Sequence, residues 1–400
     1  MDWTRLPLSR SSVDRHAERR TDPDLIAEAW RRSGTQVVVV AGGMLAVRVV
    51  DEEMPGAGPF GGAAVDHAGG APAALELLSP VDLTDVAVRL AGLDPSGGVG
   101  PGDDTSPDLA APDLATSDLA EPDLAASDVA TPDMATPDLV ASDLATPDVA
   151  AALEGLPAVA DGTALLAFLG ADEVDLLALV LPDAESLPGE HLWRSLRDVG
   201  YVLDDREVGL ASTAVALAAW HRRHPRCPLC GAATVPAAAG WTRTCVADGS
   251  EHYPRTDPAV IMAVVDDEDR LLLAHSPQWP ARRFSTLAGF VEPGESAEAA
   301  VAREVGEEVG VAIGEVAYRG SQSWPFPGSL MLAYRARAAS TEITVDEVEI
   351  AEAHWFSRPQ LLAAVTAGEV LLPTRTSIAR ALIEEWFGGP IESEAWGTTG

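Results

Sequence analysis

The strongest constraint on the fold of this chain is a segment rich in glycine and glutamate in its C-terminal half. It runs Gly289-Phe290-Val291-Glu292-Pro293-Gly294-Glu295 and, after seven further residues, Arg303-Glu304-Val305-Gly306-Glu307-Glu308-Val309-Gly310-Val311. Ser296 is a good N-cap, and the residues that follow it are mostly helix formers. The segment therefore predicts a helix over Ala297–Val309.

The predicted helix gathers three carboxylates on one arc of its surface. Glu304, Glu307 and Glu308 are spaced i, i+3 and i+4, and a neighbouring stripe of valines should bury against a sheet. No lysine lies close in sequence to relieve the repulsion, whereas a hard divalent cation would relieve it, and Mg²⁺ fits best beside a phosphate substrate. The alternative is a solvated acidic face, which the flanking glycines and Arg303 disfavour.

The whole segment resembles the Nudix box, G-x5-E-x7-R-E-U-x-E-E-x-G-U with U an apolar residue, and it fills every fixed position. The resemblance implies a hydrolase of pyrophosphate bonds that uses Mg²⁺ or Mn²⁺. It assigns the cation to Glu304 and Glu308, with Glu349 joining from a later loop. Glu307 would serve as ligand or base. Arg303 would pair with Glu295 and hold the box.

Three cysteines precede this segment. Cys227-Pro228-Leu229-Cys230 is followed, after fourteen residues, by Cys245-Val246-Ala247-Asp248. This arrangement resembles a zinc ribbon, in which two C-x-x-C knuckles hold a tetrahedral Zn²⁺. Asp248 stands where the fourth cysteine would be and can complete the site, with His252 as a less well placed substitute. The alternative is a decayed ribbon with free thiols.

A third motif follows the box. Ser321-Gln322-Ser323-Trp324-Pro325-Phe326-Pro327-Gly328-Ser329 resembles the SQPWPFPxS signature of NADH pyrophosphatases, a Nudix subfamily that also carries a zinc ribbon. Ser323 replaces a proline of that signature, as Asp248 replaces a cysteine of the ribbon. Prolines on both sides of Phe326 predict a rigid, exposed loop. The alternative is ordinary core packing of Trp324 and Phe326.

The subfamily resemblance implies a substrate and a site for it. NADH or NAD would be cut to nicotinamide mononucleotide and AMP, in a homodimer whose pocket draws residues from both subunits. The residues implied to line the dinucleotide site are Tyr253, Ile261, Phe290, Gln322, Trp324, Ser329 and Ala379. Two alternatives stay open: removal of NAD caps from RNA 5′ ends, and a non-catalytic zinc-ribbon binding module.

A strict five-residue repeat interrupts the N-terminal part at about 101–152. Nine aspartates, from Asp108 to Asp148, each precede Leu, Val or Met, usually followed by Ala. The period resembles pentapeptide-repeat proteins, but Pro before most of the aspartates removes backbone donors that such coils need. The acidic composition without aromatics favours a disordered low-complexity insert instead.

The remaining segments show ordinary helix and strand patterns. Residues 164–169 and 176–181 fit either strands or a short helix. The other predicted helices are Leu25–Arg32, Leu192–Asp198, Ser212–Arg223, Leu361–Val365 and Ile378–Phe387. The other predicted strands are Gln36–Val40 with a hairpin partner at Met44–Val50, then Ala259–Val265, Arg270–His275, Glu315–Ser321, Ser329–Arg337 and His354–Phe356.

Charge and composition narrow the setting. With 62 acidic and 27 basic residues, the net charge of −35 works against generic binding to nucleic acid or anionic membrane. The start of the chain has no apolar h-region, so no signal peptide is expected, and the apolar run at 165–181 is broken by acidic residues. With only three cysteines a disulfide framework is not expected, and this fits a reducing cytoplasm.

Together these patterns predict an α/β protein. A Nudix α/β/α sandwich at 256–388 would follow a zinc ribbon at 223–255. A smaller N-terminal α/β domain, Nudix-like and spanning 1–222, would carry the repeat, and residues 389–400 would form a tail.

Overall fold

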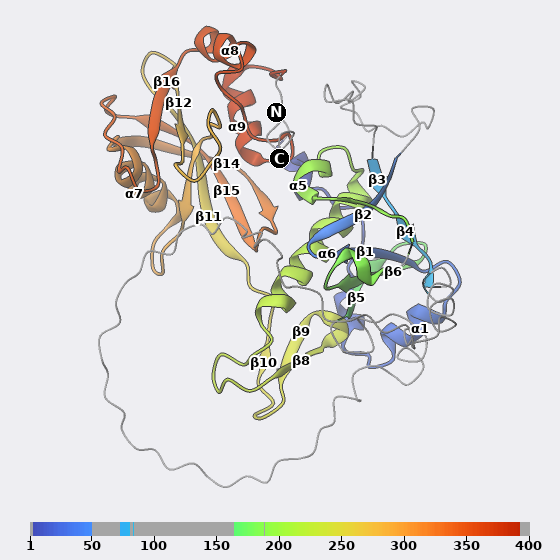
Figure 1. The fold of residues 1–400 in the computed structure, drawn as a ribbon. Helices are drawn as coiled ribbons and strands as arrows, with labels where there is room; N and C mark the ends of the chain where they lie inside the picture. Colours follow the sequence, from blue (N-terminus) through green and yellow to red (C-terminus); the bar gives the residue numbers. More distant parts are fainter. Residues whose placement is uncertain (1–2, 50–72, 81–82, 84–163, 188, 393–400) are drawn as a thin grey trace, which may run out of the picture.

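A computed structural model describes residues 3–49, 73–80, 83, 164–187 and 189–392. Three sheets follow one another along the chain (Figure 1). The five-residue repeat, for which we predict disorder, lies outside the described residues. Across the described ranges, no helix is both long and apolar enough to cross a membrane.

The N-terminal sheet has the path β3-β2-β1-β6-β5, with β4 beside β1 and β7 beside β2. Its strands are β1 (Gln36–Ala41), β2 (Met44–Val49), β3 (Ala73–Leu75), β4 (Leu77–Leu78), β5 (Leu165–Ala171), β6 (Asp175–Leu181) and β7 (Leu192–Arg194). The predicted hairpin is confirmed, because β1 and β2 pair antiparallel. Residues 165–181 form strands rather than a helix, because β5 pairs with β6 and β6 lies parallel to β1.

The predicted helix over Leu192–Asp198 is wrong in its first half. Trp193 lies opposite Ala46, so β7 joins the sheet beside β2. Only α5 (Leu196–Val199) is helical, because the Ser195 side chain accepts a hydrogen bond from the Arg197 amide and starts the helix there.

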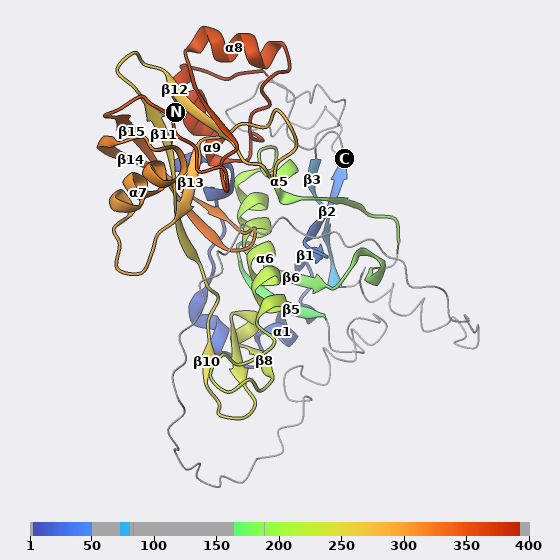
Figure 2. The same cartoon turned by 60° about the vertical axis from the view of Figure 1, so that its left-hand side comes forward.

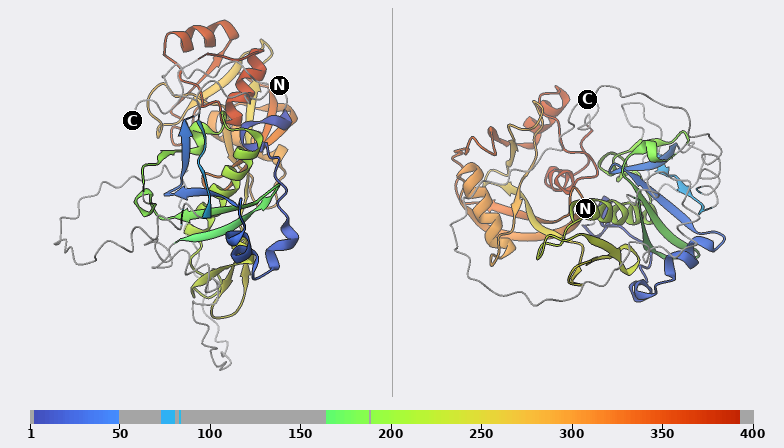
Figure 3. Two further views of the ribbon diagram at one scale, coloured as in Figure 1. Left: turned by 90° about the vertical axis from the view of Figure 1, so that its right-hand side faces the viewer. Right: turned by 60° about the horizontal axis from the view of Figure 1, so that its bottom comes forward.

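The helix predicted from Ser212 begins earlier. α6 (Asp205–Arg223) starts at a capping box, in which Asp204 accepts from the Glu207 amide and Glu207 accepts from the Asp204 amide. Figures 2 and 3 show α6 lying between the N-terminal and C-terminal sheets. The shorter helix α1 (Leu25–Arg31) has the predicted place before β1.

A small three-stranded sheet lies at the C-terminal end of α6. It consists of β8 (Thr234–Ala237), β9 (Thr242–Cys245) and β10 (Glu251–His252). His221 of α6 joins the two parts, because its ring contacts the Gly240 carbonyl and the Arg243 guanidinium, each at 2.9 Å. Arg243 also donates to the Thr234 carbonyl at 2.7 Å. This buried junction fixes the small sheet to α6.

The C-terminal sheet has the order β14-β15-β11-β12-β16, with β13 beside β11. Its strands are β11 (Asp257–Val265), β12 (Leu271–His275), β13 (Leu287–Phe290), β14 (Ile313–Trp324), β15 (Ser329–Ala338) and β16 (Glu352–Phe356). α7 (Ala297–Val309) packs on one face, while α8 (Arg358–Thr366) and α9 (Ile378–Phe387) pack on the other (Figure 1). The predicted α/β/α layering is confirmed.

The N-terminal residues bridge the two large units. Leu6 is buried in the core beneath α9, and Leu8 is buried in the core between the N-terminal sheet and α6. Trp3 Nε1 donates to Glu385 at 3.1 Å, and Ser9 Oγ donates to the Ser321 carbonyl at 2.7 Å. The 3-10 helices of the described chain are Trp3–Arg5, Pro7–Ser9, Ala17–Thr21, Ala184–Ser186 and Ala238–Gly240.

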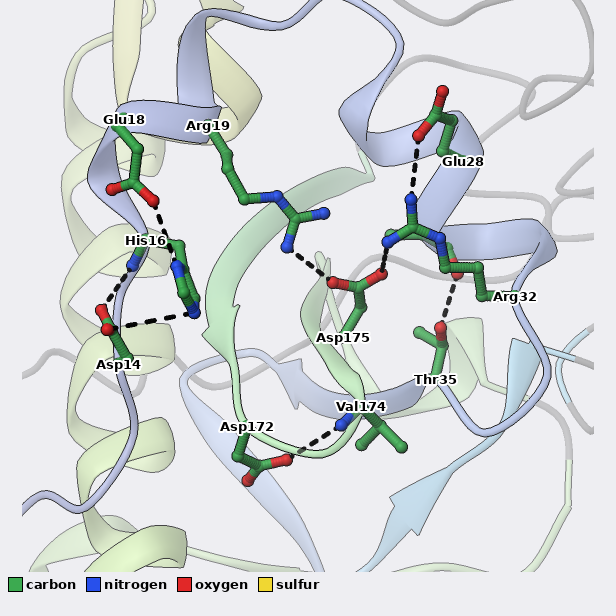
Figure 4. Close-up of polar contacts among 11 residues, drawn as sticks. Asp14, His16, Glu18, Arg19, Glu28, Arg32, Thr35, Asp172, Val174 and Asp175 are labelled. Atoms are coloured by element: carbon green, nitrogen blue, oxygen red, sulfur yellow. Dashed lines mark hydrogen bonds and ion pairs between the residues drawn. The ribbon is translucent and has the colours of Figure 1, made fainter.

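A buried carboxylate fastens the next part of the N-terminal segment to the first sheet. Asp175 accepts from Arg19 at 2.9 Å and from Arg32 at 2.6 Å (Figure 4). Its side chain is only 4% exposed. Because α1 lies between these two arginines in sequence, the two ion pairs hold this helix against β6.

Candidate active site and cysteine cluster

The predicted box helix is present with the predicted bounds. Ser296 Oγ accepts the Ala299 amide at 3.2 Å, and Gly310 ends α7 in the left-handed region, with φ 69°. The predicted valine stripe is fully buried against the sheet: Val301, Val305 and Val309. This burial fixes the rotation of α7 and therefore the direction of the glutamate arc.

Arg303 is the hub of the box. Its Nε and Nη2 bond the two carboxylate oxygens of Glu295, both at 2.9 Å, which confirms the expected pair. Nη1 donates to Glu304 at 3.0 Å and to Glu307 at 2.9 Å, and Nη2 also reaches the Phe290 carbonyl. The bidentate bond lowers the pKa of Glu295 and raises that of Arg303. One guanidinium thus joins the loop, the helix and the end of β13.

Glu304 lies directly against the backbone of Gly289. A Cβ at that position would be 1.9 Å from the Glu304 Cδ, so only glycine fits there. The Glu304 carboxylate is largely buried, and this burial raises its pKa although Arg303 acts in the opposite direction. The first glycine of the box is therefore explained by the space that this carboxylate needs.

Glu308 is the least compensated carboxylate of the box. It is 5% exposed, and its Oε2 has no hydrogen-bond partner among the described residues. Burial, followed by the charges of Glu304 and Glu349, raises its pKa to about 9. A buried carboxylate without a donor is costly unless a cation or a proton joins it. This is the arrangement expected of a cation ligand.

Glu349 comes from the loop after β15, and its charge acts on both Glu304 and Glu308. The loop is shaped by Asp346, whose Oδ1 accepts the amides of Val348, Glu349 and Ile350 at 3.2, 3.1 and 2.9 Å. Sequence reasoning missed Asp346. Its position at the start of a short acidic run was the available signal, since aspartate commonly bonds amides just ahead of it.

The residues present fit a divalent cation. Glu304, Glu308 and Glu349 are oxygen donors whose charges repel one another, and one buried oxygen is without a partner within the described part of the chain. Hard cations such as Mg²⁺ prefer a set of this kind. The guanidinium of Arg303 pairs with Glu295, Glu304 and Glu307, and no ion pair joins it to Glu308.

The residues expected to bind the dinucleotide differ in exposure. Tyr253 is 64% and Phe290 45% exposed, so both rings are accessible. Gln322 is completely buried, where it donates to the Thr376 carbonyl and accepts the Ile378 amide, at 2.9 and 2.8 Å. Three of the remaining four expected residues are also buried: Ile261, Ser329 and Ala379.

Trp324 and Phe326 are half-buried rather than exposed as predicted for this loop. Their rings contact edge to face, with centroids 5.0 Å apart. Both pack against the core formed by the N-terminal sheet and α6. The prolines limit this loop as predicted, but its aromatic rings face a neighbouring unit, which the local sequence does not reveal.

The cysteines come together with Asp248. One ligand atom from each of Cys227, Cys230, Cys245 and Asp248 lies within 4.8 Å of the others. The Leu229 and Ala247 amides each donate to a cysteine sulfur at 3.4 Å. Ser250 bonds Asp248 and lowers the pKa of this carboxylate to about 2. His252 instead contacts Ser250, so the cluster has the predicted Cys₃Asp composition.

Comparison with known families agrees with this geometry. A family model described as NUDIX domain matches residues 255–374. A second, described as NADH pyrophosphatase zinc ribbon domain, matches residues 222–253. The two models match the chain in the predicted order.

Two curated relatives are informative. The NAD-capped RNA hydrolase NudC of Mycobacterium tuberculosis is 48% identical over 200 residues, which cover 48% of this chain and 64% of that protein. The NAD-capped RNA hydrolase NUDT12 of Homo sapiens is 42% identical over 197 residues, which cover 46% of this chain and 43% of that protein. The chain thus matches less than two thirds of the length of these relatives.

A solved NUDIX hydrolase from Nitrosomonas europaea is 26% identical, with a TM-score of 0.28. The match covers 34% of this chain and 90% of that one.

Proposed function

Because a NUDIX domain here follows an NADH pyrophosphatase zinc ribbon domain, we propose that this protein hydrolyses the pyrophosphate bond of NADH or NAD. The products are nicotinamide mononucleotide and AMP. The observation that carries the proposal is the uncompensated, buried carboxylate of Glu308 beside Glu304 and Glu349, because a binding module has no need for such a destabilising cluster.

The box supplies the chemistry. Glu304, Glu308 and Glu349 would hold Mg²⁺ or Mn²⁺, which when bound neutralises phosphate charge and favours deprotonation of a water molecule. Arg303 keeps Glu304 and Glu307 in place through bonds of 3.0 and 2.9 Å. These bonds orient the carboxylates before substrate binds.

Glu307 has the access that a base or an outer ligand needs. Its side chain is 61% exposed, and its ion pair with Arg303 fixes the direction of the carboxylate. In the reaction, water adds to one phosphorus, the bridging P–O bond breaks, and a carboxylate takes the proton from water. Proton transfer to a positioned carboxylate accelerates such steps by about 10²–10⁴-fold.

Recognition of the dinucleotide falls to the residues beside β13. Tyr253 and Phe290 present accessible rings on which a base can stack. Trp324 would form a further wall of the dinucleotide site, and Ser329 lies opposite Trp324 in the β14–β15 pairing. Gln322 and Ile261 support the floor with Ala379, because Gln322 bonds the first residue of α9. The pyrophosphate is then left beside Glu308.

The ribbon has a structural role in this proposal. Its three thiolates and Asp248 would hold Zn²⁺ in a closed, four-ligand site. The domains run 1–222, 223–255 and 256–388, followed by a tail at 389–400, with an N-terminal unit related to the NUDIX fold. A homodimer in a reducing cytoplasm completes the proposal, in keeping with three free cysteines.

The decisive experiment is a hydrolysis assay with Mg²⁺ and with Mn²⁺, on NADH, NAD and NAD-capped RNA. Metal-dependent release of nicotinamide mononucleotide is the expected result. Absence of turnover on all three substrates with either metal would favour a non-catalytic zinc-ribbon module.

Removal of NAD caps from RNA is the second candidate, because the curated relatives are named NAD-capped RNA hydrolases. The same bond is cut in both reactions. The net charge of −35 disfavours a long RNA substrate. The ratio of kcat/KM for capped RNA to that for NADH, measured at two salt concentrations, separates the two candidates.

A further inference from the structure

The aromatic loop between β14 and β15 is anchored by a residue of the N-terminal unit. The Arg197 guanidinium lies 4.5 Å from the ring centroid of Phe326 and 5.6 Å from that of Trp324. Both rings also pack on the core of the N-terminal sheet. Figures 1 and 2 place α5, which carries Arg197, beside the strands β14 and β15.

Arg197 is well suited to this contact. Ser195 caps α5, while Leu196 and Val199 are buried, so the backbone of Arg197 is fixed from both sides. Arg197 is exposed, and its guanidinium makes no ion pair with a carboxylate of the described residues. A guanidinium within about 6 Å of a ring centroid is attracted by the ring face even at an exposed site, and Arg197 meets this condition for both rings.

Strand β14, which leads into this loop, is tied at two further points. Ser9 Oγ donates to the Ser321 carbonyl at 2.7 Å, from the segment that bridges the two units. Gln322 bonds both Thr376 and Ile378, at the start of α9. A displacement of the aromatic pair would therefore be transmitted to the beginning of α9, where Ala379 lies.

We propose that Arg197 is a positioning residue, through which the N-terminal unit holds Trp324 and Phe326 in the arrangement that admits the nicotinamide dinucleotide. This inference rests on the proposed function for its substrate. It assigns the N-terminal unit a part in substrate affinity. Arg197 acts through the two rings and does not touch the reacting atoms.

The test compares Arg197→Leu with Arg197→Lys and with the control Arg194→Leu. Arg194 lies on β7 just before α5, and its guanidinium donates to the Trp193 carbonyl. Arg197→Leu should raise KM for NADH about 10-fold, with kcat changed less than about 2-fold, since the cation holds rings that act on binding. Arg197→Lys keeps a cation at this position, so its KM should lie within about 3-fold of the wild-type value.

Two further measurements separate positioning from general support. Hydrolysis of a base-free pyrophosphate diester should be the same in all variants, and amide hydrogen exchange in a peptide spanning 321–329 should be faster only in Arg197→Leu. Unchanged exchange, or an equal rise of KM in Arg194→Leu, would overturn the proposal. A lower kcat and a lower melting temperature of Arg197→Leu at constant KM would also overturn the proposal. If the wild type fails to cleave NADH, the proposed function is lost, while the exchange experiment still decides whether Arg197 holds the loop.

Discussion

The carboxylates of α7 and the thiols of the ribbon are both candidate metal sites, but their electrostatics are opposite. In the box, Glu308 is buried without a donor among the described residues, and burial together with neighbouring charges raises its pKa to about 9. In the ribbon, backbone amides donate to the sulfurs of Cys227 and Cys245, and Ser250 satisfies Asp248. In the box the charged form of Glu308 is therefore unfavourable without a cation, whereas the ribbon offers a set of prearranged ligands.

This difference indicates different tasks. A carboxylate that costs stability is useful only if something binds to it during function, because otherwise a neutral residue would serve the fold better. A site with all its ligand atoms close together and supported by amides contributes to folding when metal binds. We expect substitutions in the box to alter turnover and substitutions in the ribbon to alter stability.

The largest effect is expected at the uncompensated carboxylate. Glu308→Gln removes one anionic ligand and should lower kcat at least about 10²-fold. Without added metal, the variant should be slightly more stable than the wild type, because one buried repulsion is gone. Steady-state kinetics at saturating Mg²⁺ and thermal melting with chelator measure the two effects.

Glu298→Gln is the matched control for this substitution. Glu298 lies in the first turn of α7 and is exposed. Near wild-type turnover in Glu308→Gln, or an equal loss of turnover in the control, would remove Glu308 from the catalytic set.

A smaller loss of turnover is expected at Asp346, which orders the loop of Glu349. Asp346→Ala removes the acceptor of three amides and should lower kcat about 10-fold, because Glu349 becomes less well placed. Asp267→Ala, which replaces an exposed aspartate that pairs with Arg337, serves as the control. A variant of Asp346 with normal kcat would show that Glu349 needs no support from this residue.

The candidate active site was more predictable than its surroundings. The helix bounds and the valine stripe follow from local rules of capping and spacing, whereas the Arg303–Glu295 pair was expected from the resemblance to the Nudix box. Asp346 was missed because its bonds depend on the course of a loop. The burial of Gln322 and the packing of Trp324 on another unit depend on tertiary contacts distant in sequence, which no local pattern encodes.

In the fold, too, local patterns were sufficient for neighbouring elements but not for contacts between distant parts of the chain. The hairpin of β1 and β2 is predictable because its strands are β-branched and adjacent in sequence. The prediction for 192–198 is wrong because β7 is a strand only through its pairing with β2, a partner far away in the chain. The predicted start of α6 is too late because the capping box at Asp204 precedes the apolar pattern by several residues.

In the ribbon, the expected change is in stability rather than in catalysis. Purified protein should carry about one zinc per chain, and Cys230→Ser should lower the free energy of unfolding by roughly several kcal/mol. The same variant should keep kcat within about 3-fold of the wild type, since its thiol does not take part in the reaction. Metal analysis and urea unfolding provide the measurements. Zinc-free protein prepared without chelator would identify a decayed ribbon instead.

The smaller of the two stability effects is expected at the junction between the ribbon and α6. His221 is buried, and this burial, aided by the charge of Arg243, lowers its pKa from 6.5 to about 4 despite the bond to the Gly240 carbonyl. The folded state thus binds fewer protons than the unfolded state between these two values. The stabilising contribution is complete above about pH 6.5 and is lost as pH falls toward 4, by about 2 kcal/mol at pH 5.

His221→Gln should remove this pH dependence. The stability difference between wild type and variant, from urea unfolding, should therefore shrink by about 2 kcal/mol between pH 7 and pH 5. His224→Gln, on the same helix, serves as the control and should leave the pH dependence of the wild type unchanged. A constant difference between wild type and His221→Gln would mean that folding leaves the pKa of the imidazole unchanged, so that the buried ring gains its proton below about pH 6.5 as it does in the unfolded chain. At pH 5 the junction would then contain a buried pair of cations, Arg243 and His221, beside the ribbon.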